Sequence, residues 1–180
     1  VIRLRTQLYS LLGRHSDNEE LVKKSKALAE QYLADTSSMP NGIARTALNV
    51  ATMGPDADPA WFDRIMKVYA DSKLPNVKNT LLYSMGYEDP AMINKLLDLA
   101  LTDNVTPANT ISMLGSVRRN LDDHGPFYAW LSDNAEAVLE KMPDYHVSRM
   151  PEFIATTCDA DNLAMAIEFY GPIKDKHEGM

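Results

Sequence analysis

Residues 58–117 decide the fold, and they read DPAWFDRIMKVYADSKLPNVKNTLLYSMGYE (58–88) followed by DPAMINKLLDLALTDNVTPANTISMLGSV (89–117). Both halves open with Asp-Pro-Ala, and the two prolines, Pro59 and Pro90, lie 31 positions apart. Asp followed by Pro is typical of a helix start, because the carboxylate caps the first free amides and Pro fits the first helical position. The same helix-start signal therefore occurs twice, at a spacing that is typical of a structural repeat.

Each half also contains a second helix start, at Pro75 and at Pro107, 32 positions apart. After the first proline of each half, apolar residues recur at i, i+3, i+4 and i+7, which places them on one helical face. These residues are Phe62, Ile65, Met66 and Tyr69 in the first half, and Ile93, Leu96, Leu97 and Ala100 in the second. A repeat of paired helices of this length predicts an α-solenoid, in which each pair buries its apolar stripe against the next.

The composition is that of a folded protein with an acidic surface. The chain has 180 residues, 45% hydrophobic and 24% charged, with a net charge of −7. This charge disfavours a nucleic-acid or anionic-membrane surface, both of which require clustered Lys and Arg. The single cysteine excludes an internal disulfide framework, and no apolar run is long enough to span a membrane. We predict one α-solenoid domain over residues 1–172 and a frayed tail over 173–180, in a piece cut from a longer protein.

Periodicity elsewhere predicts about eleven helices in total and no strands, so the fold class is all-α. Expected capping boxes are Ser16 with Glu19 and Asp133 with Glu136, and Trp61 and Trp130 are interpreted as core residues. The first expected stripe is Leu4, Leu8, Leu11 and Leu12, and the last is Leu163, Ala166, Ile167 and Tyr170. Expected helices include Ile43–Met53, Pro75–Met85, Pro107–Val117, Val147–Thr157 and Asp159–Tyr170, with Gly171-Pro172 closing the fold.

Few residues have the types and spacing that catalysis or metal binding needs. A metal site could be built from His15 and Asp17, or from the run Asp122-Asp123-His124. Adjacent residues rarely converge on one ion without distant partners, so loop and capping roles are favoured. Cys158 has no base beside it in the sequence, and a small buried residue at a helix junction is the favoured interpretation.

One cluster, Arg118-Arg119-Asn120, stays open as a binding site. Two arginines at the mouth of a helix, beside a polar loop, could hold a carboxylate through paired hydrogen bonds. The simpler alternative, which the spacing favours, is that they pair with Asp122 and Asp123 of the same loop. We retain these three residues as possible substrate-facing groups.

A motif around this cluster consists of Ser116, Val117, Asn120, Gly125, Ala129 and Trp130. With this motif the region resembles the C-terminal helical domain of the zinc aminopeptidases, the family of aminopeptidase N, puromycin-sensitive aminopeptidase and the endoplasmic-reticulum aminopeptidases. The segments 81–90, 96–103 and 157–170 resemble further parts of that domain, in the same order, with the last closest to bacterial members. The loop from Asn120 to Gly125 is slightly longer than the family's usual Asn-x-x-Gly.

The resemblance implies a HEAT-like, right-handed α-α superhelix that follows a zinc-bearing catalytic domain. Such a domain covers the active-site chamber and limits access of peptide substrates, and basic residues on its inner surface face the substrate. The zinc and its ligands would lie in the preceding domain, so this segment would need no cofactor and would not hydrolyse peptides alone. The implied partners are the upstream catalytic domain and the peptide, with a cytoplasmic location slightly favoured.

Two other functions remain open. A non-enzymatic HEAT-like scaffold that binds a peptide or protein on its concave face fits the same helical pattern, because solenoids serve both roles. A free-standing enzyme that uses Cys158 or a His-Asp cluster is the least favoured reading. An upstream H-E-x-x-H motif would favour the aminopeptidase, and further helical repeats would favour the scaffold.

Overall fold

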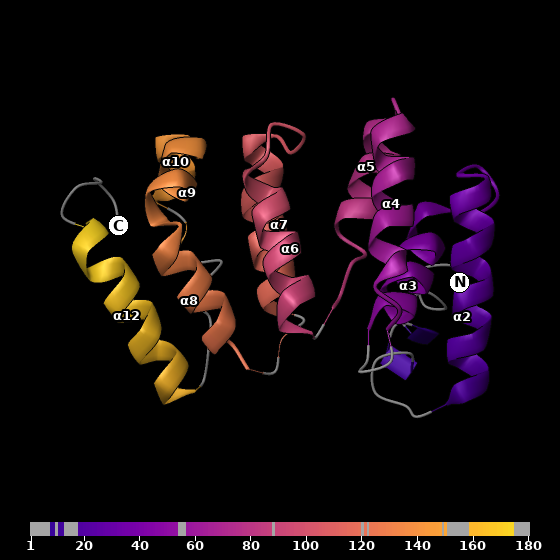
Figure 1. Cartoon of the computed structure of the whole chain (residues 1–180), viewed down its shortest axis with the longest axis horizontal. Coiled ribbons are helices and arrows are strands. Elements are labelled where there is room, and N and C mark those ends of the chain that lie inside the picture. Colours follow the sequence, from indigo (N-terminus) through magenta and orange to yellow (C-terminus); the bar gives the residue numbers. More distant parts are fainter. Residues whose placement is uncertain are drawn as a thin grey trace. The chain divides into compact units, whose positions relative to one another are not determined.

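Ten helices and no strands make up the described part of the computed structural model (Figure 1). The structure describes residues 8–9, 11–12, 18–53, 57–87, 89–119, 121, 123–148, 150 and 159–174. The all-α prediction is therefore confirmed. Two compact units divide the chain, Val1–Glu88 and Asp89–Met180, and we describe each by itself. The superhelical path and the single domain over 1–172 stay predictions.

Unit 1 is built around a central helix rich in small residues, α3 (Asn41–Thr52). It packs against α2 (Glu19–Ala34) and α5 (Pro75–Leu82), and α4 (Ala60–Asp71) packs against α5. Eight residues of α3 are buried, and three of them are alanines, whose small side chains let the neighbouring helices pack closely against α3. The largest fully buried side chains of the unit are Tyr32, Leu48, Ile65, Leu81 and Met85.

Polar side chains of α3 decide where α5 ends. The Asn49 side-chain amide donates to the carbonyl of Ser84 (3.2 Å), and the hydroxyl of Thr52 accepts from the amide of Gly86 (3.0 Å). These bonds satisfy backbone groups of the turn that would otherwise be buried without partners. Helix α5 therefore stops at Leu82, three residues before the predicted end, while Met85 is still buried beyond it.

Unit 2 begins with a hairpin of α6 (Pro90–Leu101) and α7 (Pro107–Arg119), which lie side by side (Figure 1). Helix α8 (Gly125–Asp133) packs against α6 and against α12 (Ala160–Lys174), and α9 (Ala135–Lys141) packs against α6 and α8. The short α10 (Asp144–Val147) follows α9. The core of the unit includes Leu97, Leu114, Phe127, Leu131 and Val138, and the predicted core positions of Trp61 and Trp130 are confirmed in their respective units.

The predicted helix starts at Pro75, Pro90 and Pro107 are confirmed, and the start of α4 lies one residue later than predicted, at Ala60. The carboxylate of Asp89 accepts from the amides of Ala91 (3.0 Å) and Met92 (3.1 Å), and Pro90 is the first residue of α6. The carboxylate of Asp58 accepts from the amide of Ala60 (2.9 Å), but Pro59 rather than Asp58 occupies the cap position of α4. Both carboxylates satisfy amides that have no partner within the helix.

Two predicted capping boxes are wrong. Helix α2 begins at Glu19 with Asn18 as its cap, whose side chain accepts from the amide of Leu21 (3.0 Å), so Glu19 is the first helical residue rather than the third. Ser16 itself lies outside the described residues. Asp133 is the last residue of α8, and Asn134 joins α8 directly to α9 with no side-chain cap. In each case a neighbouring Asn occupies the cap position, and Asn is among the residue types preferred there.

The last helix differs from the prediction in both its end and its buried face. Helix α12 continues through Pro172 to Lys174, because Ile173 is buried and its packing outweighs the backbone hydrogen bond that proline removes. The buried stripe contains Ala166, Phe169, Tyr170 and Ile173. Leu163 and Ile167 of the predicted stripe are 47% and 63% exposed. Two stripes share the helical period, and among the described helices it is packing against α8 that selects between them.

The first predicted stripe does not form part of the described core. Leu8, Leu11 and Leu12 are each about half exposed, and Leu4 lies outside the described residues. The predicted helix Val147–Thr157 is described only at its start and at Met150.

Candidate functional site

The last turn of α7 carries the two arginines that the sequence singles out. The helix runs two residues beyond its predicted end, so Arg118 and Arg119 are helical rather than part of a loop. Successive helical residues point about 100° apart, and here this separates the two guanidinium groups. Arg118 is buried, with 7% exposed, whereas Arg119 is exposed. The third residue of the cluster, Asn120, lies outside the described residues.

Arg118 is part of a buried polar cluster with two tyrosines, Tyr128 of α8 and Tyr170 of α12. Burial lowers the pKa of the Arg118 guanidinium, the nearby Tyr128 opposes this, and Arg119 adds to it. Burial raises the pKa of the Tyr170 hydroxyl, and the proximity of Tyr128 adds to the rise. The Tyr170 oxygen has no hydrogen-bond partner among the described residues. The cluster therefore joins three helices of unit 2, α7, α8 and α12. Burial disfavours the charged forms of the Arg118 guanidinium and the Tyr170 hydroxyl in this cluster.

The side chain of Arg119, unlike that of Arg118, lies back along α7. Its Nη1 atom lies 3.4 Å from the position that a Cβ on Gly115 would occupy, one turn earlier in α7. Glycine at that position leaves room for the guanidinium to lie against the helix while remaining accessible to solvent. Arg119 is thus the accessible cation of the predicted cluster.

The carboxylates proposed as partners for these arginines have other surroundings or are not described. The Asp123 carboxylate accepts from the amide of Gly125 (2.8 Å) at the start of α8. Asp122 lies outside the described residues, as do His15, Asp17 and Cys158. Among the described residues, no group of three or more His, Cys, Asp or Glu side chains could hold a metal ion.

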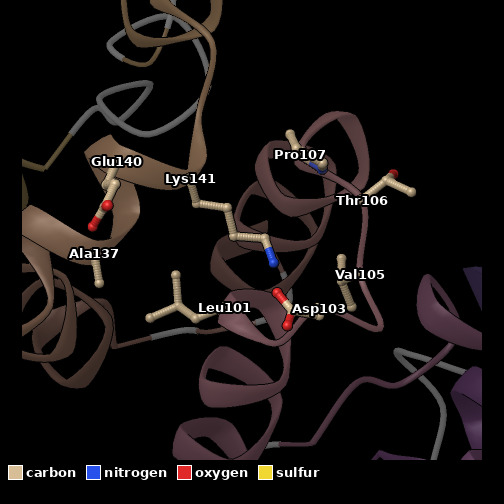
Figure 2. A pocket seen from close by; sticks show the side chains of 8 residues that line it. All are labelled: Leu101, Asp103, Val105, Thr106, Pro107, Ala137, Glu140 and Lys141. Carbon is tan, nitrogen blue, oxygen red and sulfur yellow. The ribbon is translucent and has the colours of Figure 1, made fainter.

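A groove that the sequence does not reveal lies between the α6–α7 loop and α9 (Figure 2). Its volume is about 520 Å³. Lys141 reaches across it from α9 (Figure 2). Its ammonium group donates to the carbonyl of Thr102 at the end of α6. The groove is lined by Leu101, Asp103, Val105, Thr106, Pro107, Ala137, Glu140 and Lys141.

Both apolar and charged side chains line this groove. Apolar carbon from Val105 and Ala137 forms the walls, while Asp103 and Glu140 add negative charge and Lys141 one positive charge. None of the lining residues is a histidine or a cysteine. The groove cannot be read from the sequence because its two sides lie thirty or more residues apart and meet where α9 packs on α6.

Comparison with protein-family models matches the ERAP1-like C-terminal domain over residues 1–179. The chain belongs to this family. The match confirms the resemblance to the C-terminal domain of an aminopeptidase. A comparison with curated proteins found no match. Among the described residues of this ERAP1-like domain, no helix is both long and apolar enough to cross a membrane.

Proposed function

We propose that this ERAP1-like domain forms the C-terminal wall of the active-site chamber in a zinc aminopeptidase and limits which peptides enter it. The observation that carries the proposal is the family match over residues 1–179, which covers nearly the whole chain. Zinc, when bound in the preceding domain, would polarise the scissile carbonyl and activate water. The present chain would then contribute a surface and a size limit rather than catalytic groups.

Within this function, Arg119 and Asn120 are proposed to face the substrate, and Arg118 is proposed to support them. Arg119 is exposed and has the donors to bind a peptide carboxylate. Arg118 is buried beside Tyr128, so its proposed part is to hold the end of α7 in place. A HEAT-like, right-handed superhelix would bring this end of α7 to the concave side.

The first experiment is to read the coding sequence upstream of Val1. We expect an H-E-x-x-H motif followed by a further Glu, in frame with this domain. A frame that encodes only more helix pairs would overturn the aminopeptidase hypothesis and favour the peptide-binding scaffold. In that case the 520 Å³ groove offers a binding surface.

A second experiment tests the role of Arg119 in the intact parent enzyme. We expect Arg119→Gln to raise KM for peptides with a free C-terminal carboxylate and to leave KM for the amidated peptides unchanged. The matched control is Lys174→Gln, which removes one exposed positive charge from α12. Equal KM changes for the free and amidated peptides would contradict the proposal that Arg119 binds the C-terminal carboxylate of the substrate.

A further inference from the structure

Two cations of unit 1 lie over aromatic rings on neighbouring helices. The guanidinium of Arg45 on α3 is 5.4 Å from the ring centre of Tyr83, just after α5. The ammonium of Lys78 on α5 is 4.6 Å from the ring centre of Tyr69 on α4. Both distances lie within the range of a cation–π interaction. We call these four residues the basic-aromatic surface.

The two rings belong to one locality rather than two. Burial raises the pKa of the Tyr69 hydroxyl, and the proximity of Tyr83 adds to that rise. Helix α5 packs against both α3 and α4, which brings the two cation–ring pairs together. Arg45 is exposed, and Lys78 and Tyr83 are half-buried, so the cations can be reached from solvent.

The charge of this surface is opposite to that of the chain. Residues 36–55 and 72–87, which include α3 and α5, contain no Asp or Glu, although the whole chain has a net charge of −7. Among the described helices of unit 1, Asp and Glu occur only in α2 and α4. Acidic side chains are thus absent from the two helices that carry Arg45 and Lys78, which leaves a local excess of positive charge.

A third cation of unit 1 shows what such a pair binds when a carboxylate is present. Arg64 on α4 lies 4.6 Å from the ring centre of Trp61, and its two terminal nitrogens also bind both oxygens of Glu30 on α2. The ring holds one face of the guanidinium while its edge stays free for the carboxylate. Among the described residues, Arg45 and Lys78 have ring contacts of the same kind and no ion pair with an acidic side chain.

We propose that the basic-aromatic surface binds an acidic peptide segment, whose Asp or Glu side chains take the position at Arg45 and Lys78 that Glu30 takes at Arg64. A peptide is favoured over a nucleic acid, because the chain is acidic and two cations neutralise too few phosphates for stable binding. This proposal rests on unit 1 alone and does not depend on the aminopeptidase function.

Fluorescence anisotropy of the 180-residue chain with a fluorescein-labelled peptide of alternating Glu and Ala tests the proposal. The peptide is amidated, so that only side-chain carboxylates can account for binding. We expect saturable binding that weakens with added salt and is absent for the Gln-Ala peptide. We expect Arg45→Gln with Lys78→Gln to weaken binding by about tenfold or more.

The matched control is Lys23→Gln with Lys67→Gln, which removes the same charge from exposed positions on α2 and α4. We expect it to bind within about twofold of the unchanged chain. Arg45→Lys, which keeps the charge but not the fork of donors, should fall between the two. The proposal is overturned by equal loss in both double variants, by no binding of the Glu-Ala peptide, by equal binding of the Gln-Ala peptide, or by tighter binding of single-stranded DNA.

Discussion

The hydrogen bond between Trp130 and Asp98 offers a direct test of how α8 is held against α6. The indole Nε1 of Trp130 donates to the Asp98 carboxylate at 2.7 Å, and Trp130 is only 7% exposed. A hydrogen bond to a charged partner contributes about 1.5–3 kcal/mol. Because Asp98 itself is exposed and water can replace it in part, we expect Asp98→Ala to lower the free energy of unfolding by about 1–2 kcal/mol.

The assay is urea unfolding followed by tryptophan fluorescence and far-UV circular dichroism. Asp98→Asn keeps a carbonyl acceptor and should lose about half as much as Asp98→Ala. Asp133→Ala, at the exposed end of α8, is the matched control and should stay within about 0.5 kcal/mol of the unchanged chain.

A double-mutant cycle separates this hydrogen bond from other effects of the substitution. In a Trp130→Phe background, Asp98→Ala should cost about 1 kcal/mol less than it does alone. The reasoning fails if the two substitutions are additive, or if Asp98→Ala alone changes the free energy of unfolding by less than about 0.5 kcal/mol.

Three further predictions concern single helices. Asp89→Ala should lower the free energy of unfolding by about 1 kcal/mol, because two backbone amides of α6 lose their acceptor, and Asp89→Ser should restore most of it in the same urea assay. Phe169→Ala should cost about 3–5 kcal/mol, whereas Ile167→Ala should cost under about 0.5 kcal/mol; similar losses would mean that α12 buries its other face. The hydrogen bond from Arg64 lowers the pKa of Glu30 below its ordinary 4.5, so this ion pair contributes stability above that pH and loses it as the pH falls through the lowered value. Glu30→Gln should therefore lower the urea midpoint slightly at pH 7 and not at strongly acidic pH, and a loss that persists in acid would point to packing instead.

The candidate sites were only partly predictable, because a sequence shows residue types but not exposure. The Arg118-Arg119 pair stands out in the sequence, yet the structure buries the first beside Tyr128 and leaves the second exposed. The groove beside Lys141 and the ring contacts of Arg45 and Lys78 depend on side chains from different helices. The absence of acidic residues from α3 and α5 is the one signal of the basic-aromatic surface that could have been read in advance.

The sequence by itself determined the all-α class and the starts of its repeated helices. A cap such as Asp89 binds amides only two or three residues away, so its effect is local and can be read without knowledge of the fold. The tertiary structure decided where α5 ends and which face of α12 is buried. The end of α5 depends on hydrogen bonds from Asn49 and Thr52 of α3. Which of two equally periodic stripes of α12 is buried depends on its packing against α8. Burial energy comes from neighbours that are distant in the sequence, so helical period alone cannot assign it.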